Sequence, residues 1–143
     1  MGTRADFYVG RGESAEWLGS IAFDGYPDGL KNDGVLRSTD EAGFRADVAA
    51  FLAERDDATV PSEGWPWPWE DSGTTDYAYA LHDGKVWATG GLFWFDPLKD
   101  EPEENPNPYG ERVVFPNMKH RQLVTYGKRS GLIVIHGGRI LDE

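Results

Sequence analysis

The side chains best suited to acid–base chemistry near neutral pH are three histidines, and each of them lies beside a cation. His82 and His136 directly precede predicted turns, across which they pair with Lys85 and Arg139. His120 lies between a lysine and an arginine. A neighbouring positive charge disfavours a protonated imidazole, and this effect needs no catalytic role. We therefore predict no catalytic residue.

The acids after the second predicted strand could suggest a calcium site. Asp24, Asp28 and Gly29 fall at positions 1, 5 and 6 of an EF-hand loop. Tyr26 and Val35 occupy ligand positions 3 and 12, so turn formation explains the segment better. The chain has no cysteine, which excludes thiolate metal sites and disulfides. Without a phosphate-binding glycine motif either, the sequence predicts no metal and no cofactor.

Three tryptophans, Trp65, Trp67 and Trp69, alternate with prolines and are followed by Glu70 and Asp71. Proline at this density excludes a helix or a central strand and predicts an extended loop over residues 61–75. The indoles could fold back over the sheet as a lid, or they could form an exposed platform that binds a partner. A third reading, carboxylate catalysis on a sugar stacked against indole, rests only on adjacency.

A second acidic segment, residues 96–110, holds four prolines and five acids, and loops of this length are often functional. Aromatic side chains would act as desolvated anchors, and acids would steer a basic partner. The partner-binding residues that we predict are Trp65, Trp67, Trp69, Glu70, Asp71, Asp100, Glu101, Glu103 and Glu104.

Charge is distributed unevenly along the chain, whose formal net charge is −11. Residues 1–111 hold 23 acids and 8 bases, a charge of −15, whereas residues 112–143 hold 2 acids and 6 bases, a charge of +4. Such a field repels nucleic-acid phosphates and attracts proteins with basic surfaces. We expect no direct binding to duplex DNA or RNA. The simpler alternative is that the acidity only maintains solubility.

Two other function classes stay open. A small-ligand or nucleotide enzyme would have its site between the loop that contains Trp65, Trp67 and Trp69 and a basic strip that could bind anions. That strip consists of Lys119, His120, Arg121, Lys128 and Arg129. Alternatively, the protein could self-associate, with the acidic part of one copy docking on the basic tail of the next. The sequence leaves the oligomeric state undecided.

One helix and several strands must position these residues. Ser38 and Glu41 are spaced as a capping box, and Phe44, Val48 and Leu52 recur at helical spacing. We therefore predict an amphipathic helix over about residues 39–55. Three turn signatures predict a loop over residues 24–34. The strands that we predict cover residues 6–10, 17–23, 77–82, 85–89, 91–95, 113–115, 122–126, 132–136 and 139–141.

The best local signal is the dipeptide Asp83-Gly84 between two alternating runs, which predicts a type I′ hairpin. In that hairpin Leu81 pairs with Val86, and Tyr79 pairs with Ala88. Together these elements predict an α+β fold in which one antiparallel sheet of about five to seven strands packs against one main helix. The length of 143 residues fits a single domain, residues 1–143.

The compartment follows from what the sequence lacks. Residues 1–10 have no apolar signal-peptide core, and no segment approaches the roughly 20 apolar residues that span a bilayer. We expect a cytoplasmic protein without a membrane partner.

The N-terminal segment carries one resemblance. Residues 1–12 (MGTRADFYVGRG), 16–22 (EWLGSIA) and 24–29 (DGYPDG) resemble the start of small acidic proteins from bacteriophages and proteobacterial mobile elements. That group has no assigned activity and supplies no functional residues. Phages use small acidic proteins as inhibitors of host defence, some of which present carboxylates where a nuclease binds phosphates. The resemblance thus implies an anti-defence inhibitor acting through protein–protein interaction.

Overall fold

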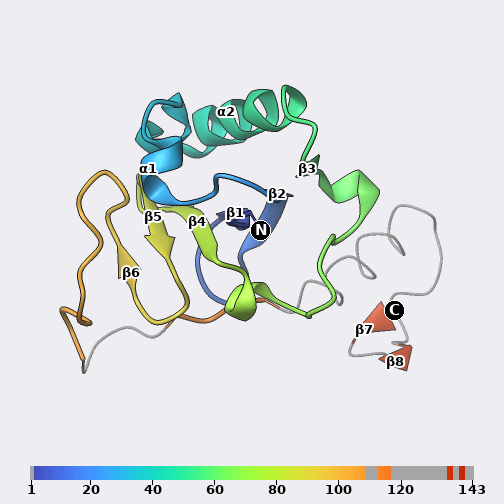
Figure 1. The fold of residues 1–143 in the computed structure, drawn as a ribbon. Helices are drawn as coiled ribbons and strands as arrows, with labels where there is room; N and C mark the ends of the chain where they lie inside the picture. Colours follow the sequence, from blue (N-terminus) through green and yellow to red (C-terminus); the bar gives the residue numbers. More distant parts are fainter. Residues whose placement is uncertain (1, 109–112, 117–134, 137–138, 141–143) are drawn as a thin grey trace.

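The computed structural model describes residues 2–108, 113–116, 135–136 and 139–140. Its main feature is a six-stranded sheet in the order β3-β2-β1-β4-β5-β6, with helix α2 across one face (Figure 1). The strands of this sheet are β1 (Ala5–Val9), β2 (Glu16–Ile21), β3 (Ala58–Thr59), β4 (Tyr77–His82), β5 (Lys85–Thr89) and β6 (Trp94–Phe95). The predicted α+β class with one main helix is confirmed.

The sheet is mixed, whereas we predicted an antiparallel one. β1 and β4 run parallel, with Ala5 opposite Tyr77 and Val9 opposite Leu81, and the other neighbouring strands are antiparallel. The chain forms the β1–β2 hairpin, places β3 on the outer edge of β2 and then returns to the free side of β1. A parallel pair needs a long connection, which residues 10–76 supply here.

Helix α2 (Glu41–Ala53) confirms the predicted helix and its buried stripe. Phe44, Val48 and Leu52 are buried against the sheet, with residues such as Phe7 and Tyr79 in the same core cluster. This cluster also includes residues of the short helix α1 (Pro27–Leu30) and the 3₁₀ helix η1 (Gly34–Arg37). The predicted loop over residues 24–34 therefore contains helical turns. Pro27 favours this because its fixed φ suits the first position of a helix.

The cap of α2 differs from the prediction. Asp40 is the N-cap residue, and its carboxylate accepts a hydrogen bond from the backbone N–H of Gly43 at 2.6 Å. Ser38 instead donates through its hydroxyl to Asp47 at 2.8 Å. Asp40 directly precedes the first helical residue, so its carboxylate reaches the free N–H groups that Ser38 would have capped.

The β4–β5 hairpin has the predicted register, with Leu81 opposite Val86 and Tyr79 opposite Ala88. The φ angles of Asp83 and Gly84 are 51° and 74°, as a type I′ turn requires. The positive φ of Asp83 is tolerated because aspartate enters the left-handed region more easily than most side chains.

The other predictions have mixed outcomes. The strand predicted at residues 91–95 is reduced to β6, and residues 113–115 are not a strand. The extended loop predicted at residues 61–75 contains two short 3₁₀ turns, η2 (Pro61–Glu63) and η3 (Ser72–Thr74). The C-terminal hairpin is confirmed as β7 (Ile135–His136) paired with β8 (Arg139–Ile140). The strand predicted at residues 122–126 lies outside the described residues.

Candidate functional site

The face of the sheet opposite α2 is covered by the loop that contains the three tryptophans. A second core cluster lies on this face and buries Tyr8 and Trp17 from β1 and β2 and two alanines of β4. Trp65 packs against this cluster, and its ring meets that of Trp17 edge to face with centroids 5.0 Å apart. The Trp-Pro loop, residues 64–71, therefore completes the second side of the fold.

Each indole of the Trp-Pro loop donates its N–H within the protein. Trp65 donates to the carbonyl of Trp69 at 2.7 Å, and Trp69 donates to the hydroxyl of Thr75 at 2.9 Å. Trp67 donates to the carboxylate of Asp6 at 2.6 Å. All three rings are half-buried. This geometry is that of the lid that we considered, with part of each ring left exposed.

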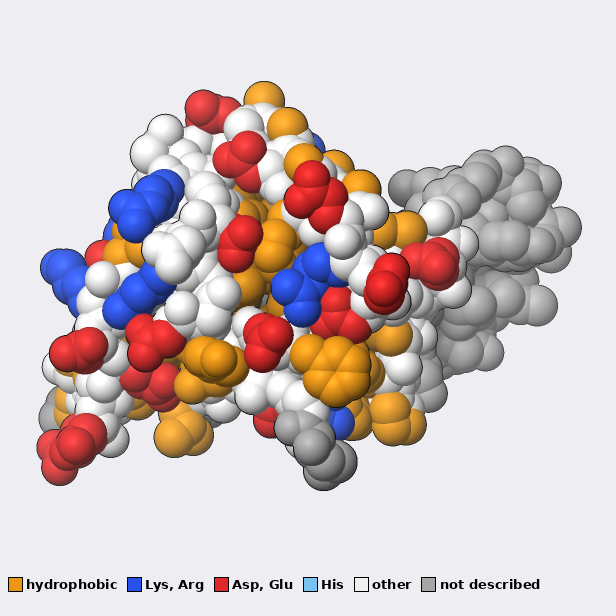
Figure 2. Space-filling view, turned by 45° about the horizontal axis from the view of Figure 1, so that its top comes forward, with side chains coloured by type: hydrophobic (Ala, Val, Ile, Leu, Met, Phe, Trp, Pro, Cys, Tyr) orange, Lys and Arg blue, Asp and Glu red, His pale blue; other side chains and the backbone are white. Residues whose placement is uncertain are grey.

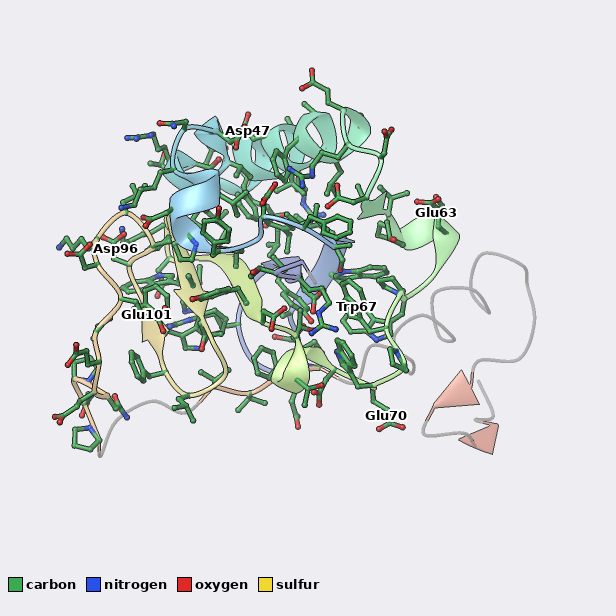
Figure 3. All side chains as sticks on the ribbon, in the orientation of Figure 1. Asp47, Glu63, Trp67, Glu70, Asp96 and Glu101 are labelled. Carbon is green, nitrogen blue, oxygen red and sulfur yellow. The ribbon has the colours of Figure 1, made fainter. Side chains whose placement is uncertain are left out.

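Arg4 places a cation over two of the three indoles. The rings of Trp67 and Trp69 stack at 5.5 Å and 16°. The Arg4 guanidinium lies 5.1 Å from the centroid of Trp69 and 6.0 Å from that of Trp67, within range of a cation–π interaction. Arg4 also pairs with Asp76 at 3.2 Å. Figure 3 shows Trp67 directed toward the sheet, while Glu70 points away from it.

Beneath the lid lies Asp6, a fully buried carboxylate on β1. It accepts hydrogen bonds from the hydroxyls of Ser20 and Ser72 and from the indole of Trp67. The Tyr8 hydroxyl is hydrogen-bonded to Ser72. Burial raises the pKa of Asp6, and the hydrogen bonds oppose this shift only in part. Asp6 thus connects β1, β2 and the lid.

Our sequence analysis missed this buried carboxylate network. The sequence feature that could have indicated it is a single acid, Asp6, in an otherwise apolar and aromatic strand. A buried charge without a partner is costly, so such an acid is expected to have hydrogen-bond partners. Its partners Ser72 and Trp67 lie more than 60 residues away in the chain. The strand pattern alone could therefore not name them.

The raised pKa of Asp6 predicts how stability changes with pH. Folded Asp6 keeps its proton at pH values where the unfolded chain has lost it. Its contribution to stability therefore falls as pH rises from the ordinary aspartate pKa of 3.8 through the raised folded value. The stability of the wild type relative to Asp6→Asn should fall over this range in urea denaturation at successive pH values. A difference that rises with pH would contradict this assignment.

The second acidic segment lies elsewhere on the molecule. Asp100, Glu101, Glu103 and Glu104 are all exposed. Tyr77 at the start of β4 donates its hydroxyl to Glu101 at 3.0 Å, which attaches the loop to the sheet. Burial, this hydrogen bond and nearby carboxylates raise the pKa of Tyr77 to about 12.

The structure does not bring the two predicted acidic groups together. Glu70 and Glu101 lie well apart in Figure 3. Glu70 is exposed, and the half-buried Asp71 accepts a hydrogen bond from the backbone N–H of Gly73 at 2.8 Å. Asp71 therefore caps the turn η3. The two groups are separate surfaces.

Most cations of residues 2–108 form ion pairs with acids of the same chain. This segment holds 22 acids and 8 bases, a formal charge of −14. These ion pairs include Arg4–Asp76, Lys31–Asp28, Arg45 with Glu16 and Glu41, Arg55–Asp57 and Lys85–Asp96. Acidic side chains are distributed across the face shown in Figure 2, with hydrophobic side chains between them. The excess charge that remains at the surface is negative.

Other site classes find no support in the described part of the chain. No group of three or more histidines and acids there is placed to hold a metal ion. None of the helices described is both long and apolar enough to cross a bilayer. The predicted anion-binding strip lies outside the described residues; it comprises Lys119, His120, Arg121, Lys128 and Arg129.

Comparison with protein-family models, with curated proteins and with solved structures finds no match to this chain.

Proposed function

We propose that the protein acts by binding another protein, one whose basic surface normally contacts nucleic acid. One observation carries this proposal. Most cations of residues 2–108 are neutralised by ion pairs within the chain, while the carboxylates of Asp100, Glu103 and Glu104 stay exposed on one loop. A surface of this kind attracts a basic partner and steers its approach.

The proposed primary contact is the loop that carries Asp100, Glu103 and Glu104, called the acidic loop below. Its carboxylates would occupy positions that phosphates take on the partner, and binding would weaken as salt rises. Glu70 and Asp71 at the end of the Trp-Pro loop form a second, separate surface that a large partner could reach. The N-terminal resemblance to phage and mobile-element proteins supports a more specific role, inhibition of a host defence or nucleic-acid-binding protein.

A charge-reversal experiment tests this proposal. The triple variant Asp100→Lys, Glu103→Lys, Glu104→Lys should lose capture of a basic nucleic-acid-binding protein from host lysate, and the remaining binding should depend less on salt. The readout is affinity capture at two salt concentrations, followed by titration of the purified partner. We expect at least a tenfold loss of affinity, or about 1.4 kcal/mol.

The matched control carries the same change in net charge at another place. Asp33, Glu54 and Asp56 are exposed acids outside the loop, and their triple change to lysine leaves residues 100–104 intact. If both triple variants lose the same affinity for the partner, the loss is explained by net charge alone and not by the acidic loop. Unchanged binding in the loop variant would reject the acidic loop as the contact.

A further inference from the structure

Two aromatic side chains stand exposed on the turn between β2 and α1. Phe23 is 53% exposed and Tyr26 is 42% exposed. Both belong to the few large hydrophobic residues that the described part of the chain leaves in solvent. Because they are three residues apart, their Cα atoms lie within about 11 Å. Both aromatic residues therefore lie on the same short turn.

The backbone at Phe23 is held by hydrogen bonds, and each of the two rings lies near a glycine. The Phe23 backbone N–H donates to Asp57 at 2.8 Å, and its carbonyl accepts from Arg55 at 2.8 Å. The Phe23 ring packs on Gly2, where a Cβ atom would lie 2.1 Å from it. The Tyr26 ring lies near Gly29, where a Cβ atom would be 3.3 Å from it. A turn whose backbone is already fixed loses little conformational entropy when a partner binds.

The turn itself is fixed by contacts from the sheet. Gly25 donates its N–H to the carbonyl of Thr3 at 2.9 Å and accepts a hydrogen bond from the Tyr79 hydroxyl at 2.6 Å. Asp24 adopts a φ of 60°, a conformation that non-glycine residues rarely take.

The charges around the rings select the partner. Asp24 and Asp28 are exposed beside the aromatic pair. Two cations of neighbouring segments are already engaged, Arg55 with Asp57 at 2.7 Å and Lys31 with Asp28 at 2.9 Å. Asp24 accepts no hydrogen bond from the described residues. A guanidinium can stack on an aromatic ring and donate to a carboxylate at the same time, which an ammonium does less well.

We infer that Phe23 and Tyr26, with Asp24 between them, form a docking surface for an arginine-rich segment of a partner protein. This inference rests on the proposed function and adds a contact that the acidic loop does not supply. The aromatic rings would provide the short-range anchor, and the distributed carboxylates would provide the long-range attraction.

The test uses nona-arginine and nona-lysine peptides as probes of the intact protein. In titrations, Phe23→Ala with Tyr26→Ala should weaken nona-arginine binding about tenfold, whereas nona-lysine binding should change less. Amide shifts on adding nona-arginine should centre on residues 22–28. Leu92→Ala is the matched control, because Leu92 is 81% exposed and lies outside the turn. It should bind as the wild type does.

Several results would overturn this inference. They are failure of the wild type to bind nona-arginine, wild-type affinity in the double variant, or equal loss in Leu92→Ala. Loss of a sedimenting dimer in the double variant, without loss of peptide binding, would assign the surface to a second copy instead. If the double variant keeps the captured basic partner while the acidic-loop variant loses it, the proposed function stands and this surface is rejected.

Discussion

Replacing Asp6 with alanine should lower the free energy of unfolding by about 3 kcal/mol at pH 7. The substitution leaves the hydroxyls of Ser20 and Ser72 and the indole of Trp67 without their common acceptor beneath the lid. Each buried donor without a partner costs about 1–3 kcal/mol, and part of this cost is recovered when a hydroxyl rotates to a new acceptor. Urea denaturation followed by tryptophan fluorescence measures the loss.

Two further variants isolate the role of the Asp6 carboxylate. Asp6→Asn keeps the shape and one acceptor oxygen, so it should lose clearly less stability than alanine. Asp71→Ala removes a partly exposed acid whose hydrogen bond caps the turn η3, and it should cost about 1 kcal/mol. If Asp6→Ala unfolds within 1 kcal/mol of the wild type, Asp6 does not hold the lid to the sheet.

Alanine at Gly19 should destabilise the fold by about 2–4 kcal/mol. Gly19 lies on β2 opposite Phe7, where the pairing of β1 and β2 shifts register, and its φ is 146°. A Cβ atom there would lie 2.4 Å from Leu52 Cδ1 and 2.9 Å from the carbonyl oxygen of Thr59. The end of the buried Leu52 side chain would have to shift, and the Thr59 oxygen belongs to the backbone of β3, which cannot move without disturbing its pairing with β2. Thermal unfolding would record the loss.

Gly12→Ala is the control for Gly19→Ala, because it shows the cost of a positive φ without the cost of steric crowding. Gly12 also has a positive φ, 85°, but a Cβ atom there would have no neighbour within 4 Å. Only the conformational cost applies, about 1 kcal/mol. Similar losses at Gly12 and Gly19 would show that the close approach of α2 to β2 does not limit the side chain at residue 19.

Local patterns predicted the elements that depend on neighbouring residues. Asp83 and Gly84 determine their hairpin and its register because a two-residue turn of this type matches the twist of the strands. The stripe of Phe44, Val48 and Leu52 likewise determines which face of α2 is buried. The cap was mispredicted because Ser38 and Asp40 are both acceptable N-cap residues, and only the helix start decides between them.

Features that join distant residues could not be predicted in the same way. The parallel pairing of β1 with β4 depends on where the chain returns to the sheet, which no short pattern encodes. For the same reason, Asp6 could not be recognised as the acceptor for Trp67. The Trp-Pro loop was correctly expected to be irregular, but two of its indoles find their partners outside it, on β1 and at Thr75. The sequence did not show that Phe23 and Tyr26 are exposed, because exposure depends on how the whole chain folds around them.

The central position of β1 has a consequence for synthesis of the chain. β1 pairs with β2 on one side and with β4 on the other, and contacts such as Arg4–Asp76 span 72 residues. At typical elongation rates of about 5–20 residues per second, β1 waits roughly 4–14 seconds for β4. During this interval the β1–β2 hairpin has an unpaired edge, which is a template for intermolecular strand pairing. Productive folding on the ribosome therefore depends on keeping nascent chains apart, and their shared negative charge favours this by mutual repulsion.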